Sequence, residues 1–187
     1  MKKNFLNFLL ETLKSLILAG IIVLPIRLFI FQPFLVQGAS MAPHFSTGDY
    51  LIVDEISFRF REPRRGEVIV FKYPVHPSQK FIKRVIGLPG ETVEVKDGNI
   101  FINGKILKED YLNNVLTFPT AKISLGPDEY FVLGDNRDSS LDSRVFGPLK
   151  RKYLVGRVLI KVFSWKVIPL PALEIIKVPS FNFNEQN

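Results

Sequence analysis

The sequence contains no cysteine among its 187 residues, and it has only two histidines, His44 and His76. Without cysteine the chain can form no disulfide, bind no metal through thiolates and use no thiol as a nucleophile. It also lacks a glycine-rich phosphate loop and a His-Glu-x-x-His motif, so the sequence indicates no nucleotide, no metal and no other cofactor. The chemistry of an active site would therefore depend on hydroxyl, amine and carboxylate groups.

The charge balance is basic, with 25 Lys and Arg against 18 Asp and Glu, a net charge of +7 and an isoelectric point of about 9.6. A basic surface fits an anionic membrane or nucleic acid as a partner. A plain solvated surface is the alternative, and charge alone does not choose among the three. The hydrophobic content of 47%, with seventeen Phe, is enough for a sizeable core.

An apolar stretch follows Lys2 and Lys3 and runs to Phe34. Its uncharged centre, residues 15–26, is shorter than the roughly 20 residues that a membrane-spanning helix needs. The flanking apolar residues supply the missing length if the few charged side chains reach toward the membrane surface. We therefore predict a membrane anchor over residues 1–31. The two lysines predict a cytoplasmic N-terminus with the rest of the chain outside.

Two alternatives to the anchor remain open. A cleaved signal peptide would end near residues 36–39, and a buried helix of a soluble protein would carry a similar apolar run. Pro25 and Arg27 weaken the case for a membrane-spanning helix.

After Phe34 the pattern changes to short apolar runs between turns. Asp-Gly and Asn-Gly pairs are strong hairpin signals, so the runs predict a β-meander. The predicted strands are 49–54, 68–71, 81–86, 92–95, 99–102, 105–107, 130–133 and 155–160. Strands this short and close predict a mainly β fold, barrel-like or a sandwich. The less regular pattern of residues 108–123 predicts a loop or an excursion within the meander. The polar residues 179–187 are predicted to form a frayed tail.

Ser40 lies just after the apolar stretch, and a nucleophilic serine needs a base. His44 lies in the same local segment and His76 in a turn, so neither is well placed. Lys83 lies in an apolar, strand-like run next to Arg84. Burial and a neighbouring like charge both favour neutral lysine, which can accept a proton. A Ser-Lys dyad is thus chemically possible, although most serines and lysines in proteins are not catalytic.

Residues 134–144 form a dense polar run, Gly-Asp-Asn-Arg-Asp-Ser-Ser-Leu-Asp-Ser-Arg, directly after a predicted buried strand. One interpretation is a solvated loop with Asx turns. The other is a support for the dyad, in which a serine bonds the lysine and an Asp-Arg pair fixes the loop. Arg84 is then either a surface charge or the partner of a carboxylate of this loop.

Four segments together resemble the bacterial type I signal peptidases (leader peptidases), membrane-anchored Ser-Lys proteases that remove signal peptides. The segments are 38–43 with 48–53, 65–71, 81–91 and 134–147, and they occur in the family's order. Each alone is moderately specific and the combination is very specific. The resemblance implies that Ser40 is the nucleophile, that Lys83 is the general base, and that Ser140 orients Lys83. The implied supporting residues are Ser140, Asp142, Arg144, Arg84 and Asp135.

The resemblance also implies a mainly β catalytic core with an inserted β-hairpin subdomain at about residues 91–125. The catalytic domain, residues 32–178, would lie on the extracytoplasmic side of the inner or plasma membrane behind a single anchor. Its partners would be membrane lipid and exported preproteins with small residues at the first and third positions before the cut. No metal, cofactor or nucleic acid is implied.

Substrates of this kind would bind extended, as an added strand. Val36, Met41 and Ile82 flank the dyad and are the predicted substrate-binding residues, with ordinary core positions as the alternative. Gly38 stands where some members have a serine that helps bind the oxyanion, so the backbone N–H of Ser40 is the chief remaining donor.

Two smaller departures are His44, where threonine is common, and Glu91, where aspartate is usual; we expect His44 to face solvent or a turn, without a catalytic role. Two other functions remain open. A self-cleaving repressor-type Ser-Lys protease would need a DNA-binding helical module and an internal Ala-Gly cleavage site, and neither is visible. A membrane-tethered β-domain binding module would need no catalysis.

Overall fold

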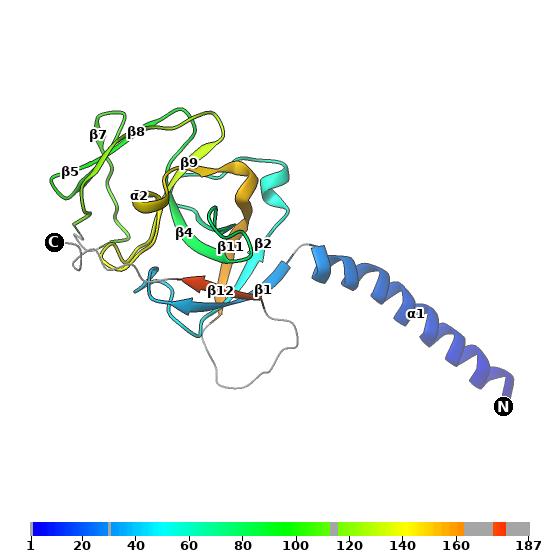
Figure 1. Ribbon diagram of the computed structural model, residues 1–187. Helices are drawn as coiled ribbons and strands as arrows, with labels where there is room; N and C mark the ends of the chain where they lie inside the picture. Colours follow the sequence, from blue (N-terminus) through cyan, green and yellow to red (C-terminus); the bar gives the residue numbers. More distant parts are fainter. Residues whose placement is uncertain (1, 30, 113–115, 163–173, 179–187) are drawn as a thin grey trace.

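The structure is a computed structural model that describes residues 2–29, 31–112, 116–162 and 174–178. Within these ranges the fold is mainly β, as predicted, with the strands arranged in two sheets (Figure 1). The helical elements are α1 (Lys2–Phe29), α2 (Ser143–Phe146) and the 3-10 turns η1 (Ser57–Arg59) and η2 (Arg151–Tyr153).

The larger sheet has eight strands in the order β10-β9-β4-β12-β1-β2-β11-β3, and β3 also pairs with β4. Its strands are β1 (Phe31–Gly38), β2 (Tyr50–Asp54), β3 (Val68–Lys72), β4 (Lys80–Gly87), β9 (Glu129–Leu133), β10 (Leu149–Lys150), β11 (Leu154–Val162) and β12 (Glu174–Val178). Because β3 pairs with β4 as well as β11, the strands β4, β12, β1, β2, β11 and β3 follow one another in a closed ring. This ring is the barrel-like arrangement that the short strands predict.

The central strands are buried on both faces. Val70 and Ile82 belong to one apolar cluster, whereas their neighbours Ile69 and Phe81 belong to a second. Alternate residues of a strand point to opposite faces, so β3 and β4 each separate two packed regions. Lys83, in the middle of β4, therefore has no face that opens to water, and it is 0% exposed.

The smaller sheet has four antiparallel strands in the order β7-β6-β5-β8. They are β5 (Thr92–Lys96), β6 (Asn99–Ile102), β7 (Lys105–Ile106) and β8 (Thr120–Ser124), all within the segment predicted as an inserted subdomain. The hairpin turns have positive φ at both central residues, 50° and 76° at Asp97 and Gly98 and 51° and 79° at Asn103 and Gly104. These are the turns that Asp-Gly and Asn-Gly favour. A third apolar cluster joins the two sheets through Ile86 and Leu133 on one side and Val93 and Leu125 on the other.

Several parts of the chain differ from the prediction. Phe31, predicted as the last residue of the anchor, is the first residue of β1. The stretch 108–123, predicted as irregular, contains most of β8, and β1, β10 and β12 were not predicted as strands. The predicted frayed tail lies outside the described residues.

Helix α1 projects away from the β body in Figure 1. Over the described part of the chain, no helix combines the length with the apolar content that crossing a membrane requires.

Candidate active site

The predicted nucleophile and base lie together. Ser40 lies in the turn after β1, Lys83 is in the middle of β4, and both side chains are 0% exposed. The Lys83 Nζ is hydrogen-bonded to Ser40 Oγ, and it also donates to the carbonyl oxygen of Ile82 at 3.0 Å. The two residues are 43 positions apart in the chain, so the pairing depends on the fold.

Burial controls the protonation of Lys83. It lowers the pKa of the side chain from 10.5 to about 7, while the charges of Asp142 and Asp135 raise that pKa and the charge of Arg144 lowers it. A large fraction of the side chain is therefore neutral near pH 7. Our expectation that Arg84 supplies the like charge is wrong, because that cation is Arg144.

The turn that carries the nucleophile is fixed to the polar loop 134–144. The backbone N–H of Asn136 donates to the carbonyl of Ser40 at 3.0 Å, and its side-chain amide donates to the carbonyl of Ala39 at 3.2 Å. Gly134 packs so closely that an added Cβ would lie 2.2 Å from Ser140 Oγ and 2.5 Å from the Ser40 carbonyl oxygen. Only glycine fits there, because real Cβ atoms do not come so close to other heavy atoms.

The predicted Asp-Arg pair is present within the same loop. Both oxygens of Asp142 accept from Arg144, from Nε and Nη2 at 2.8 Å each. Asp142 also accepts from the backbone N–H of Gly134 at 3.1 Å, so one buried carboxylate fixes the loop at both ends. Ser140 is buried as well, but its Oγ makes no hydrogen bond to a described residue, and the predicted bond to Lys83 is thus not seen.

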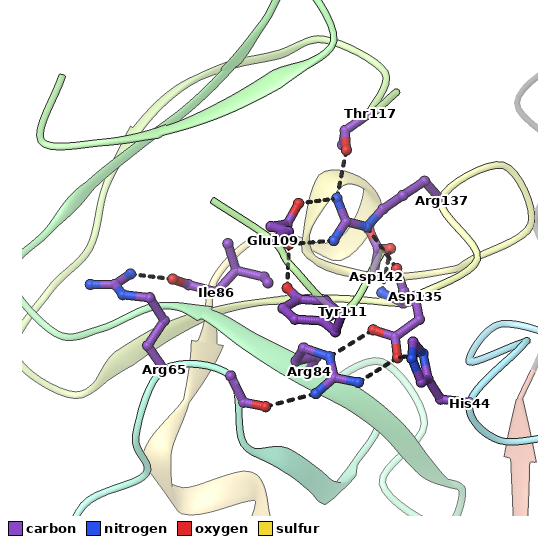
Figure 2. Close-up of polar contacts among 12 residues, drawn as sticks. His44, Arg65, Arg84, Ile86, Glu109, Tyr111, Thr117, Asp135, Arg137 and Asp142 are labelled. Atoms are coloured by element: carbon purple, nitrogen blue, oxygen red, sulfur yellow. Dashed lines mark hydrogen bonds and ion pairs between the residues drawn. The ribbon is translucent and has the colours of Figure 1, made fainter. Parts of the chain in front are cut away.

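Arg84 is the partner of a carboxylate of the loop and not a plain surface charge (Figure 2). Its Nε and Nη2 donate to the two oxygens of Asp135 at 2.8 and 2.6 Å, and its guanidinium lies 4.1 Å from the centre of the Tyr111 ring. His44 does not simply face solvent, because its Nδ1 lies 2.9 Å from Asp135 Oδ2, although not in hydrogen-bond geometry. The Arg84–Asp135 pair links β4 to the polar loop 134–144, which contains the other supporting residues.

Sequence reasoning gave no role to Arg137, which is fully buried beside the site. It donates to the carbonyl of Gly134 at 2.9 Å, to Thr117 Oγ1 at 2.6 Å, and to both oxygens of Glu109 at 2.9 and 2.6 Å (Figure 2). The polar loop 134–144 is thereby joined to the segment that contains Glu109 and Thr117. The sequence gives no signal for this role, because one arginine in a polar run is usually exposed. Its partners Glu109 and Thr117 are also 28 and 20 positions away in the chain.

The predicted substrate-binding residues are all buried, with Val36 1%, Met41 0% and Ile82 0% exposed. They belong to one apolar cluster, which also contains Ile176 of β12. A cavity of about 510 Å³ lies elsewhere, against Arg59, Lys72, Lys80 and Arg151 among others, and includes neither dyad residue. Ser40 and Lys83 are themselves 0% exposed, so both side chains are enclosed by described residues.

The chain is similar in sequence to signal peptidases. The family profile that matches is described as signal peptidase, peptidase S26, and it spans residues 9–165. A probable signal peptidase I-2 of Synechocystis sp. is 36% identical over 175 residues, 91% of this chain and 78% of its own. Signal peptidase I V of Bacillus subtilis is 37% identical over 172 residues, 83% of this chain and 96% of its own. A signal peptidase I of Enterococcus faecalis with a crystal structure is 39% identical, with coverage of 54% of this chain and 98% of that one and a TM-score of 0.48.

Proposed function

Since this chain belongs to the signal peptidase family, peptidase S26, and is a signal peptidase I protease, we propose that it cleaves signal peptides with Ser40 as nucleophile and Lys83 as general base. The observation that carries the proposal is the buried hydrogen bond between Ser40 Oγ and Lys83 Nζ. A serine needs a base within hydrogen-bond reach, and the lowered pKa of Lys83 supplies a neutral amine near pH 7.

The proposed reaction has two halves. Neutral Lys83 takes the proton of Ser40, whose Oγ attacks the carbonyl carbon at the end of the signal peptide. The amine of the mature protein leaves with that proton, and an acyl-enzyme remains. A water that Lys83 deprotonates then attacks the ester and releases the signal peptide.

The oxyanion of each step is proposed to bind the backbone N–H of Ser40. This group donates no hydrogen bond to a described residue, so it is available to a ligand. A backbone donor held in place before the reaction stabilises the developing charge without reorganisation. The fixed turn around Asn136 and Gly134 supports this role, because it holds the donor in one position.

The supporting residues are proposed to act through the lysine. The Asp142–Arg144 and Asp135–Arg84 pairs fix the loop against β4, and the two carboxylates limit how far the pKa of Lys83 falls. Ser140 Oγ is buried and makes no hydrogen bond to a described residue. We propose that it accepts a hydrogen bond from the Lys83 side chain when that side chain becomes an ammonium during the reaction. A hydroxyl that accepts from the charged form would orient the proton for the leaving amine.

The substrates proposed are exported preproteins with small residues at the first and third positions before the cut. They would bind as an extended strand against the cluster that contains Val36, Met41 and Ile82. The family membership and the dyad geometry disfavour the two other functions, a self-cleaving repressor and a binding module without catalysis.

Helix α1 is proposed to attach the enzyme to membrane lipid as a single span, with the N-terminus cytoplasmic and the catalytic domain, residues 32–178, on the extracytoplasmic side. Large exposed apolar side chains are spread around α1, and burying them requires an apolar environment. At 1.5 Å per residue its 28 residues extend about 42 Å, more than a hydrocarbon core of about 30 Å. Residues 22–26 continue the apolar sequence. The large apolar side chains described on α1, each 48–65% exposed, are Phe5, Phe8, Leu10, Leu13, Leu16, Ile17, Leu18 and Ile21.

The test is cleavage of a preprotein by the detergent-solubilised enzyme. Ser40→Ala and Lys83→Ala should each abolish cleavage, and the double variant should be no worse, because groups that act as one unit are not additive. Lys72→Ala, an exposed lysine on the neighbouring strand, is the matched control and should cleave normally. Residual activity in Lys83→Ala together with an inactive His44→Ala would assign the base to His44 instead.

The membrane arrangement is tested separately. A protease added to intact cells, with any outer membrane permeabilised, should degrade the catalytic domain and spare the N-terminus. Protection of the catalytic domain would reverse the proposed topology and leave the dyad assignment unaffected.

A further inference from the structure

Strand β12 closes the β ring at the active site. It lies between β1 and β4 and runs parallel to both, as Figure 1 shows for β12 in red beside β1 in blue. Its pairing with β1 extends from Phe34 opposite Glu174 to Gly38 opposite Val178, and Ile176 pairs with Lys80 of β4. Strands β1 and β4 do not pair with each other, and among the strands that the structure describes β12 is the one that lies between them.

Two strand edges meet this space. Without β12 the backbone N–H and C=O groups of β1 and β4 that face it would have no strand partner. Unpaired edges of this kind are the place where an extended peptide adds to a sheet. The gap between β1 and β4 is thus a groove made for one strand, with backbone hydrogen bonds available on both sides.

The side chain of Ile176 occupies the middle of this groove. It is 0% exposed and packs in the same cluster as Val36, Met41 and Ile82. These three are the residues that we propose for contact with substrate. The chain's own strand therefore covers the surface that a preprotein would need.

The direction of β12 also matches that of an approaching substrate. Val178 is level with Gly38, and two residues beyond Gly38 the neighbouring chain reaches Ser40. A peptide that runs parallel to β1 in this register is carried toward the nucleophile.

From this arrangement we infer that in the free enzyme the chain's own segment 174–178 occupies the strand position between β1 and β4 where the preprotein is proposed to bind. The segment is an internal competitor, and a preprotein binds by taking its place between the two strands. The inference rests on the proposed function, because it identifies the groove with the binding site for the preprotein.

A disulfide lock tests the inference on the full chain. Gln37 and Lys177 are opposite each other on β1 and β12, and neighbouring strands are about 4.8 Å apart, within the range that a disulfide spans. The native chain has no cysteine, so Gln37→Cys with Lys177→Cys gives one defined pair. Oxidation, verified by mass spectrometry, should lower preprotein cleavage by about tenfold or more, because only enzyme with an open groove binds substrate.

Reduction of the locked enzyme should restore the rate, and each single-cysteine variant, oxidised and reduced in the same way, should not respond. Full activity of the verified cross-linked enzyme would overturn the inference. An enzyme that is inactive both oxidised and reduced, with a folded circular dichroism spectrum and active single-cysteine variants, would also count against a displaceable strand. Loss of the proposed function itself appears differently, as cleavage that survives Ser40→Ala.

A second variant weakens the internal competitor. Ile176→Asp places a carboxylate in the apolar cluster and should release the strand, so KM for the preprotein should fall while kcat is kept. Ile160→Asp, at an exposed isoleucine on β11, is the matched control and should leave KM unchanged. An unchanged or raised KM in Ile176→Asp, with the thermal unfolding transition intact, would contradict competition. If Ile176→Asp does not unfold cooperatively, the activity of the cross-linked double-cysteine enzyme decides whether the inference holds.

Discussion

Replacing Lys83 by methionine should abolish cleavage and at the same time stabilise the fold. The lysine side chain is fully buried, and methionine is unbranched and of similar length, so it can fill the same space. The change removes the base and also the desolvation cost of a buried amine. Activity and stability should therefore move in opposite directions.

The magnitude follows from the pKa. Burial lowers the pKa of Lys83 from 10.5 to about 7, and each pKa unit corresponds to about 1.4 kcal/mol. At pH 7 the unfolded chain carries a protonated lysine, so this shift lowers the free energy of unfolding of the wild type by about 4 kcal/mol. Methionine leaves Ser40 Oγ without its bond, which costs about 1–3 kcal/mol. The net expectation is a variant that is more stable by about 1–3 kcal/mol at pH 7.

The effect has a definite sign in pH. The folded-state pKa is the lower one, so below pH 7 the lysine is protonated in both states and the gap between variant and wild type is constant. As pH rises from about 7 toward 10.5 the unfolded lysine also loses its proton, and the wild type regains stability. The gap should therefore be largest at and below pH 7 and should shrink toward pH 10.5.

Urea unfolding followed by circular dichroism, in the same detergent as the cleavage assay, measures both quantities. Lys72→Met is the control, because that lysine is exposed and should show little change. A Lys83→Met enzyme that is less stable than wild type at pH 7, or a gap that widens as the pH rises, would refute the argument that burial controls this side chain.

Three further changes test the surroundings of the dyad. Gly134→Ala places a Cβ 2.5 Å from the carbonyl oxygen of Ser40, so cleavage should fall by about 100-fold with far-UV circular dichroism preserved, and normal kinetics would show that the loop can relax. Arg137→Met removes the cation that pairs with the mostly buried Glu109, which then keeps only the hydrogen bond from Tyr111, and should cost about 3–5 kcal/mol in urea unfolding. Arg137→Lys should be less severe, and a change under 1 kcal/mol, roughly the value of a surface pair, would mean that the pair contributes little. Asp135→Asn removes a charge that raises the pKa of Lys83, so the acid limb of the kcat/KM profile should move to lower pH, and an unmoved limb would contradict that coupling.

The hairpins of the smaller sheet follow from local chemistry. Asp97-Gly98 and Asn103-Gly104 determine the turns, and the alternation around them determines the pairing of β5 with β6 and β6 with β7. The burial of β4 was equally readable, because its apolar residues occur in succession. The contact between Ser40 and Lys83 is not local: residue chemistry made the dyad possible, and the motif resemblance selected it.

The missed elements lack such local signals. Strand β12 pairs in parallel with residues some 140 positions earlier (Phe34 with Glu174), and a parallel pair needs no adjacent turn. Strand β8, Thr-Ala-Lys-Ile-Ser, lacks a clear alternation because most of its residues stay exposed. The apolar residues of β1 continue those of α1 without a break in composition, which placed the predicted boundary at Phe31.

The guanidinium of Arg137 connects two parts of the molecule, the polar loop 134–144 and the segment that forms the smaller sheet. Arg137 belongs to the polar loop 134–144, yet two of the three partners of its side chain, Glu109 and Thr117, lie in the smaller sheet's segment, residues 91–125. A shortened segment that omits those partners would leave an uncompensated cation in the core, beside the loop that contacts Ser40. An engineered change that replaces or shortens this segment must therefore exchange Glu109, Thr117 and Arg137 together. The smaller sheet and the polar loop 134–144 cannot be varied independently of each other.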